Sequence, residues 1–386
     1  MNCKKCDSSH TVLLRKKDYY CDDCFMVNTN HKFRACIGKN KILIPNENVL
    51  IGISGGVGST VLLDLVNHAV TLENTKKLRI VPFFVHLLDE ERKDSAQAVI
   101  KQCNKYNINV YIIHLAEYMD LKFDIPEANC IPETEENKVK LFHDMLNSMP
   151  ITAATDFLLK VKRNLLVEFA KKVKCRIVFT GETTSTLAIN LLTNLATGRG
   201  SQVQDDIGFC DVRDKEIKIL RPIKDISKEE LDYYVAIKQL SPFHEKDVIS
   251  NSLQSVIASF VSDLQKDFQA TISTVCKTAD KIGNQERMND ERNMQEKCVI
   301  CKSNLHTRDL NISALEATNI SRKVSLGNAQ FRQYLDNNPD ISSLESDATP
   351  SVFPLINKYL CYGCSRNQSE MNQTKLPPYI EEVLKL

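Results

Sequence analysis

Eight of the 14 cysteines in this 386-residue chain occur in four Cys-x-x-Cys pairs, a pattern that points to metal binding. The pairs are Cys3/Cys6, Cys21/Cys24, Cys298/Cys301 and Cys361/Cys364. Each such turn places two thiolates on one side of the backbone, and two turns complete a tetrahedral four-thiolate site. The first two pairs lie 14 residues apart, which is close to the spacing of zinc ribbons. We therefore predict a structural zinc ribbon in residues 1–36, against the alternative of four reduced surface cysteines.

The two C-terminal pairs are separated by 59 residues, which is long for one ribbon. They share a metal only if residues 302–360 form an excursion that returns the chain to its start. Two unrelated turns or a redox-active pair are the alternatives, and the spacing leaves zinc against an iron–sulfur cluster open. We favour one shared zinc site. The stretch 337–350 is rich in Asn, Asp, Ser and Pro and is expected to be a mobile loop.

A glycine-rich turn supplies the second candidate for chemistry. Residues 53–60 read ISGGVGST and lie between an apolar run and a helical pattern. Glycines in a strand-to-helix turn let backbone N–H groups face an anion, and the helix N-terminus adds a partial positive charge. The candidate nucleotide-binding residues are Ser54, Gly55, Gly56, Ser59 and Thr60. The alternative is a plain tight turn with Ser59 as a helix cap, since neither GKS/T nor GxGxxG is present.

Alternating strands and helices must position this turn. Apolar runs of four to eight residues predict buried parallel strands at 48–53, 79–86, 109–115, 176–180 and 217–220. Amphipathic stretches predict helices at 59–70, 90–106 and 156–174, and one further long helix over 249–278. The alternation predicts an α/β fold with a doubly wound parallel sheet, which binds ligands at the carboxyl ends of its strands.

Composition excludes several classes of protein. Fifty basic residues against 49 acidic ones give a net charge of +1, which excludes a histone-like protein or an acidic disordered tail. No apolar run reaches the roughly 18 residues of a membrane helix, so we expect no membrane partner. The polar start, MNCKKC, carries no signal-peptide pattern. A cytoplasmic, reducing location is therefore expected.

Several segments resemble those of known enzymes. The SGGxxS turn resembles the PP-loop (SGGxDS) of ATP pyrophosphatases, which adenylylate a carbonyl oxygen and release pyrophosphate. The segment 180–185 resembles the second nucleotide-side loop of that group and adds Gly181 to the nucleotide-binding candidates. The segment 221–231 resembles an element of PP-loop tRNA-modifying enzymes, and its Ser227 and Glu230 predict a capping box.

The order of these segments and of the cysteine pairs resembles the cytoplasmic tRNA 2-thiolation protein 2 family over nearly the whole chain. The resemblance implies a Rossmann-like PP-loop fold and a role in 2-thiolation of the wobble uridine of tRNA. It also implies a partner similar to cytoplasmic tRNA 2-thiolation protein 1, and sulfur from a thiocarboxylated ubiquitin-related modifier. The domains expected are a zinc ribbon (1–36), a PP-loop domain (37–245), a helical segment (246–297) and a C-terminal Cys-x-x-Cys region with a mobile insertion (298–386).

Two departures from the PP-loop pattern bear on catalysis. Gly58 stands where active members carry aspartate, so ATP remains a possible ligand of a degenerate loop. The predicted catalytic domain holds only scattered cysteines, and a sulfur relay needs paired thiolates. These single cysteines are Cys103, Cys130, Cys175 and Cys210. We therefore predict a subunit that is not catalytic alone, with no catalytic residue assigned. The alternatives are a self-sufficient ATP-dependent tRNA thiotransferase and a non-enzymatic zinc-ribbon RNA-binding scaffold.

Local basic stretches are candidates for tRNA contact. Residues 1–36 carry seven basic against four acidic residues, and residues 155–176 carry seven against two. Phosphate contacts favour such clusters, although a solvated helix face has the same composition. The RNA-binding candidates are Arg34, Lys162, Arg163 and Arg199. Arg199 lies between two glycines, and flexible flanks are expected to free its guanidinium for bidentate contacts.

Overall fold

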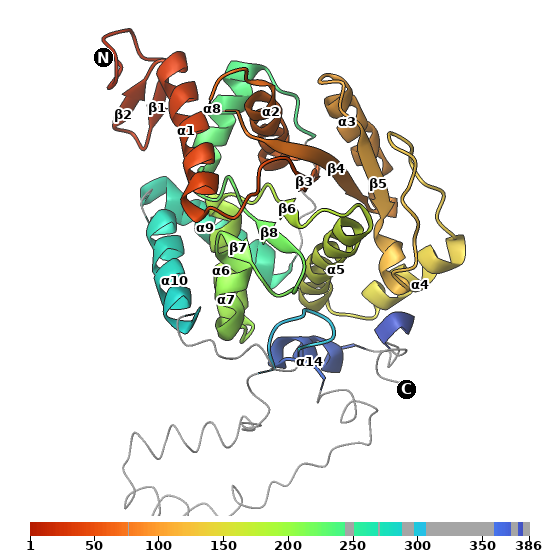
Figure 1. Ribbon diagram of the computed structural model, residues 1–386. Coiled ribbons are helices and arrows are strands. Elements are labelled where there is room, and N and C mark those ends of the chain that lie inside the picture. Colours follow the sequence, from red (N-terminus) through yellow and green to blue (C-terminus); the bar gives the residue numbers. More distant parts are fainter. Residues whose placement is uncertain are drawn as a thin grey trace, which may run out of the picture.

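A computed structural model describes residues 1–75, 77–243, 251–268, 271–287, 297–305, 359–371 and 377–380 (Figure 1). The predicted loop at 337–350 and most of the excursion between the C-terminal cysteine pairs lie outside the described residues. No helix in the described ranges is both long and apolar enough to cross a lipid bilayer.

The centre of the molecule is a six-stranded sheet in the order β5-β4-β3-β6-β8-β7. The strands are β3 (Glu47–Gly52), β4 (Ile80–Leu88), β5 (Val110–His114), β6 (Ile177–Phe179), β7 (Cys210–Asp211) and β8 (Lys218–Leu220). All neighbouring pairs are parallel except β7 with β8. The predicted parallel sheet is confirmed. The antiparallel edge strand β7 was not predicted, because two residues are too short for a periodic signal.

Side chains of β3 alternate between two hydrophobic cores, one on each face of the sheet. Val49 and Ile51 belong to the core built with α1 (Asp22–Asn40), α2 (Val57–Thr71), α3 (Lys93–Asn104) and α8 (Lys228–Lys238). Leu50 belongs to the opposite core, built with α4 (Glu136–Asn147) and α5 (Ile151–Lys172). Helices therefore cover both faces, as a doubly wound fold requires. Short 3-10 turns lie at Glu90–Arg92, Leu115–Met119 and Gly200–Gln202.

The single long helix predicted over 249–278 is wrong. The structure has two helices, α9 (Leu253–Asp267) and α10 (Thr271–Arg287), with Phe268 at φ −126° and ψ 69° after the first. Val261 of α9 and Ile272 of α10 both pack on α6 (Thr184–Ala196). The break lets two apolar faces reach the same helix, which one straight helix could not do. The short α7 (Val203–Ile207) completes this helical group.

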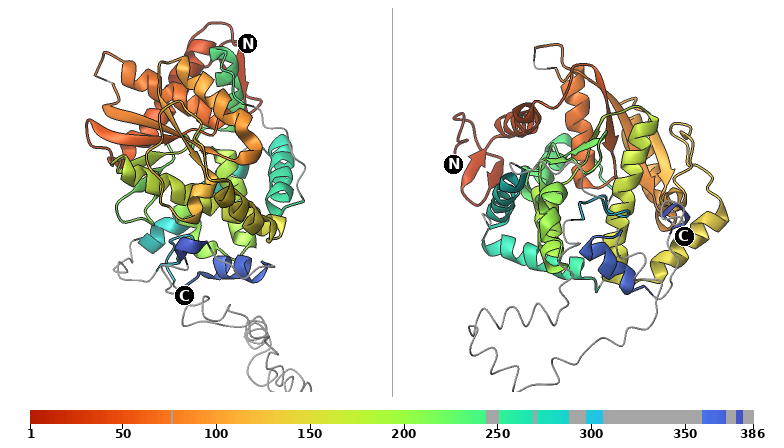
Figure 2. Two further views of the ribbon diagram at one scale, coloured as in Figure 1. Left: turned by 90° about the vertical axis from the view of Figure 1, so that its right-hand side faces the viewer. Right: turned by 60° about the horizontal axis from the view of Figure 1, so that its bottom comes forward.

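The two cysteine-containing segments lie at opposite ends of the body (Figures 1 and 2). The N-terminal ribbon pairs β1 (Val12–Leu14) with β2 (Asp18–Tyr20) in antiparallel fashion. It is joined to α8 by the ion pair between Lys32 and Glu230, at 2.5 Å. The predicted capping box at the start of α8 is confirmed. The C-terminal segment, with α14 (Tyr362–Ser369), packs against the end of α5.

Candidate functional site

Two loops meet where the sheet reverses its winding direction. From β3 the chain proceeds to β4 and β5 on one side, whereas β6 and β8 lie on the other. The loops that follow β3 and β6 therefore face each other at the carboxyl ends of adjacent strands, the position at which doubly wound sheets bind ligands. The first loop holds the SGG turn and the second begins at Thr180.

Hydrogen bonds inside the first loop fix its shape. The Thr60 hydroxyl donates to the carbonyl oxygens of Gly55 (3.0 Å) and Gly56 (2.9 Å), and the Ser59 hydroxyl donates to that of Gly56 (3.0 Å). Gly55 has φ of +87°, which favours glycine. Ser54, Gly56 and Ser59 line the cavity above the loop, whereas Gly55 and Thr60 support the turn from behind.

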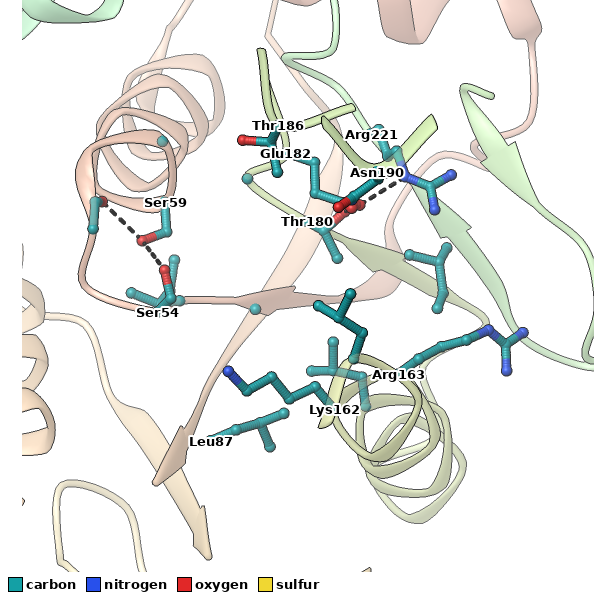
Figure 3. Close-up of a pocket in the computed structure, with 18 of the residues that line it drawn as sticks. Ser54, Ser59, Leu87, Lys162, Arg163, Thr180, Glu182, Thr186, Asn190 and Arg221 are labelled. Carbon is teal, nitrogen blue, oxygen red and sulfur yellow. Dashed lines mark hydrogen bonds and ion pairs between the residues drawn. The ribbon is translucent and has the colours of Figure 1, made fainter. Parts of the chain in front are cut away.

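The cavity has a volume of about 590 Å³ (Figure 3). Its lining also includes Gly181 from the second loop and Lys162 and Arg163 from α5. Figure 3 shows these two basic side chains leaving α5 in opposite directions, with Lys162 on the side of Ser54. The structure thus gathers most of the nucleotide-binding candidates and two of the RNA-binding candidates around one cavity.

Gly58 and Gly181 are packed against each other, so the two loops touch through backbone. A Cβ atom on Gly58 would lie 2.4 Å from the Gly181 carbonyl oxygen. One on Gly181 would lie 2.8 Å from the backbone nitrogen of Ser59. The absence of a carboxylate at position 58 is therefore also a packing requirement, because this loop arrangement has no room for any side chain there.

Replacing Gly181 with alanine should lower the free energy of unfolding by about 1–3 kcal/mol, since the added methyl group meets backbone that has to move. Urea unfolding of the full chain measures the change. Gly56→Ala is the matched control, because its Cβ atom would approach nothing closer than the Ser54 hydroxyl at 3.7 Å. Equal stability of the two variants would contradict the tight contact between the loops.

Buried ion pairs hold the wall of the cavity opposite the first loop. Asp211 accepts from Arg163 (2.7 and 3.1 Å) and from Arg213 (3.0 and 2.6 Å), and Arg213 also pairs with Asp206 at 2.8 Å. Burial alone would raise the pKa of Asp211, but the two guanidinium groups hold it well below its usual range. These charges neutralise one another and form a rigid wall.

Lys162 differs from its basic neighbours. Within the described part of the chain its ammonium group forms no ion pair or hydrogen bond, and the side chain is open to the cavity. Enclosure by protein, followed by repulsion from Arg92, lowers the pKa of Lys162. This ammonium group and the backbone N–H groups at the start of α2 are the groups that an anion in the cavity would contact.

The prediction that Arg199 offers a free guanidinium to RNA is wrong. Its side chain is 1% exposed and forms an ion pair with Asp156 at 2.6 Å. Arg163 is also buried and is held by Asp211, so neither is accessible to RNA in this conformation. Lys162 faces the cavity, and Arg34 lies on α1, outside it. No local pattern indicated this burial, because the acidic partners lie far away along the chain.

Other residues of the cavity were not anticipated from the sequence. Glu182 accepts from Arg221 at 2.6 Å across the second loop. The buried His86 forms hydrogen bonds with the Ile53 carbonyl oxygen (2.8 Å) and the Ser95 hydroxyl (3.1 Å), and so supports the end of β3. The segments 180–185 and 221–231, which contain Glu182 and Arg221, were singled out from the sequence without a role for either residue, and no pattern pointed to His86.

Both sets of four cysteines form compact clusters. Within each set all four sulfur atoms lie within 4.8 Å of one another. The two C-terminal pairs are therefore brought together, as predicted, and the Cys301 and Cys361 sulfurs are 3.5 Å apart. A tetrahedral ion with metal–sulfur bonds of ~2.3 Å separates its sulfurs by about 3.8 Å. The residues present thus fit one four-coordinate ion in each cluster.

The two clusters share one design. In each, the first pair lies in a turn closed by a β-bridge, Asn2 with Ser9 and Lys297 with Asn304. The second pair starts a helix, with Cys21 as the N-cap of α1 and Cys361 as the N-cap of α14. A helix N-terminus favours the thiolate form that binds metal. The clusters differ in burial, since all four C-terminal cysteines are buried and three of the N-terminal ones are partly exposed.

The remaining cysteines of the body do not form a relay. Burial raises the pKa of the Cys103 and Cys175 thiols to about 12, so both stay protonated and unreactive. Cys210 is buried in the core on the α1 and α2 face of the sheet, and Cys130 lies exposed between β5 and α4. Among the described residues that line the cavity, none is a cysteine.

Two family profiles and several known proteins match this sequence. A family profile described as Cytoplasmic tRNA 2-thiolation protein 2 matches residues 252–366, and one described as PP-loop domain matches residues 26–129. Cytoplasmic tRNA 2-thiolation protein 2 from Aedes aegypti is 31% identical to this chain, with 94% of this chain and 90% of that protein covered. The chain belongs to the cytoplasmic tRNA 2-thiolation protein 2 family. The family member from Danio rerio is 27% identical over 98% of this chain and 89% of its own length.

Among solved structures, the U34-tRNA thiolase NcsA from Methanococcus maripaludis, with its 4Fe-4S cluster, has a similar fold. Its TM-score is 0.58 at 19% identity, covering 78% of this chain and 91% of that chain. This likeness confirms the predicted PP-loop fold for this member of the cytoplasmic tRNA 2-thiolation protein 2 family. The names of these two relatives agree with the predicted cytoplasmic location.

Proposed function

We propose that this member of the family acts in 2-thiolation of the wobble uridine of tRNA, as a subunit that does not complete the reaction alone. Membership of the family and the thiolase-like fold support a role in tRNA thiolation. The observation that carries the subunit assignment is a cavity beside the SGG loop whose described lining holds no cysteine. Such a cavity can hold a phosphate, but it offers no thiolate to carry sulfur.

The catalytic thiols and the sulfur then come from partner proteins. A PP-loop subunit similar to cytoplasmic tRNA 2-thiolation protein 1 would supply the catalytic thiols, and a thiocarboxylated ubiquitin-related modifier would supply sulfur. The tRNA would contact basic surface, of which the ribbon in residues 1–36 offers the most among the exposed candidates. The cytoplasm is the proposed compartment.

We further propose zinc as the metal of both cysteine clusters. The sulfur separations suit a mononuclear tetrahedral ion with no open position, as structural zinc requires. A four-iron cluster would hold its four thiolates considerably farther apart, because each thiolate binds a different corner of the cube. When bound, zinc would join two distant turns of the chain and perform no redox chemistry. Cys3, Cys6, Cys21 and Cys24 would hold one ion, and Cys298, Cys301, Cys361 and Cys364 the other.

Deleting the protein and measuring 2-thiouridine at the wobble position by mass spectrometry tests the proposed pathway. We expect the modification to be lost and to return with the wild-type chain.

Pyrophosphate release from ATP, measured with the purified chain alone and with its partner, tests whether the chain turns over ATP by itself. We expect release only with the partner. Release by the chain alone would favour the self-sufficient enzyme, and unchanged 2-thiouridine would exclude a role in thiolation. Normal thiolation by variants changed in the SGG loop would favour the RNA-binding scaffold.

Lys162→Gln should weaken binding of a nucleotide or inorganic pyrophosphate by ~10- to 100-fold, which corresponds to one charge-assisted hydrogen bond of ~1.5–3 kcal/mol. Because Lys162 forms no ion pair with any residue that the structure describes, the thermal midpoint of unfolding should stay unchanged. Calorimetric titration of the full chain measures the affinity. Lys101→Gln, an exposed change in the last turn of α3, is the matched control. Equal affinity of both variants would remove Lys162 from the anion site.

A further inference from the structure

The loop containing Arg199 lies directly on the last Cys-x-x-Cys turn, residues 361–364. Gly198 has φ of +75°, and a Cβ atom there would lie 2.6 Å from the Tyr362 ring. A Cβ atom on Gly363 would lie 2.6 Å from Arg199 Cζ. Gly363 therefore makes room for the Arg199 side chain, and Gly198 makes room for the Tyr362 ring of the same turn. This close fit gives Gly198, one of the two glycines beside Arg199, a packing role rather than a role in flexibility.

The guanidinium group is shared between cysteine sulfurs and a carboxylate. Its Nη1 donates to Cys361 Sγ (3.7 Å) and Cys364 Sγ (3.6 Å), and its Nη2 donates to Asp156 Oδ2 (2.6 Å). Asn367 from α14 donates to the same carboxylate oxygen at 2.6 Å. Asp156 also lines the cavity of the first loop, so this network runs from the cysteine cluster to the cavity wall.

Charge explains why a buried cluster needs this arginine. Four thiolates around a divalent ion carry a net charge of −2, and all four C-terminal cysteines are buried. Burying uncompensated charge is costly, because water no longer solvates it. A guanidinium group adds one positive charge and two N–H donors, and hydrogen bonds between ionised groups are the strong ones.

The negative charge of the N-terminal cluster is stabilised differently. There the Lys5 backbone N–H donates to Cys3 Sγ at 3.5 Å, and the other three cysteines are partly exposed. Backbone amides and water can stabilise that cluster without a charged side chain. The two clusters share a design but differ in burial, and the arginine accompanies the buried one.

We propose that Arg199 is a positioning residue of the C-terminal metal site. Its guanidinium holds Cys361 and Cys364 by hydrogen bonds, offsets half of the negative charge of the metal–tetrathiolate centre, and joins that centre through Asp156 to the cavity. The proposal rests on the proposed binding of a divalent ion, and it assigns Arg199 to the metal rather than to RNA.

Zinc competition with a chromogenic chelator on the full chain tests this assignment. A Cys24→Ser variant identifies which of the two zinc equivalents is N-terminal. Arg199→Met should weaken retention of the C-terminal zinc by ~10- to 100-fold, the usual effect of losing a hydrogen bond to a metal ligand, and leave the N-terminal zinc unchanged. Arg199→Lys keeps the charge but cannot reach both sulfurs and Asp156, so it should recover only part of the affinity.

A spectroscopic readout separates this role from general stabilisation. In the cobalt-substituted protein, removing N–H donors makes the thiolates more electron-rich, so the sulfur-to-cobalt charge-transfer band should move to lower energy in Arg199→Met. Gly363→Ala retains the arginine but displaces its guanidinium and should give the same shift, which keeps the test decisive if Arg199→Met fails to fold. Unchanged zinc retention and band energy in folded variants would overturn the proposal. A wild-type chain that binds no metal would instead overturn the proposed zinc sites.

Discussion

Replacing Cys301 with serine is expected to reduce bound zinc from two equivalents to one per chain and to unfold the C-terminal segment locally. Structural zinc contributes ~10–16 kcal/mol of folding free energy in small modules, and this segment includes short pieces of chain joined through the cluster. The core on the α1 and α2 face of the central sheet contains no residue of the C-terminal segment, so the sheet should remain folded. Elemental analysis gives the metal content, and hydrogen exchange in 297–305 and α14 reports the local unfolding.

Two controls accompany this prediction. Cys130→Ser changes a single exposed cysteine and should leave both zinc equivalents and the exchange pattern unchanged. Cys24→Ser should remove the other zinc equivalent and expose β1 and β2 while α14 stays protected. The shared C-terminal site would be refuted if Cys301→Ser retained two zinc ions or left α14 as protected as in the wild type.

Asp211→Asn is expected to lower the free energy of unfolding at neutral pH by about 3–5 kcal/mol, the usual cost of removing one partner from a buried ion pair. The substitution leaves the guanidinium groups of Arg163 and Arg213 without the carboxylate that joins them. Both are buried at the cavity wall, so water cannot replace the lost charge. Urea unfolding of the full chain measures the loss.

The acid dependence of stability provides a second measurement of the same group. The pKa of Asp211 is held well below its usual range in the folded protein, so its stabilising effect is present above the unfolded carboxyl pKa of ~3.9. That effect is lost as the pH falls through the depressed folded value. The variant should therefore lose less stability than the wild type on acidification. Asp18→Asn, which breaks the surface pair with Lys4, is the control and should change little. Equal losses at both positions would show that the buried network does not hold the cavity wall.

Local patterns in the sequence were sufficient for much of the fold and for part of the site. The parallel strands follow from short apolar runs, because a strand buried on both faces needs apolar residues at nearly every position. The shape of the SGG loop follows from glycines at a strand end, and the capping box of α8 follows from Ser227 and Glu230 three residues apart. The N-terminal cluster needed only two Cys-x-x-Cys turns at ribbon spacing. Each of these features depends on neighbours in the chain, which is why the pattern was informative.

Tertiary packing alone decided how distant residues were used. Lys162 and Arg163 are adjacent in sequence, yet one faces the open cavity and the other is held by Asp211, because successive helical residues point in different directions. The contact of Gly58 with Gly181 depends on two strands lying side by side in the sheet. Arg199 looked free beside two glycines, but its partners come from α5 and from the final cysteine pair. The carboxylates that hold Arg163 and Arg199 lie more than 40 residues away along the chain, and no local pattern contains that information.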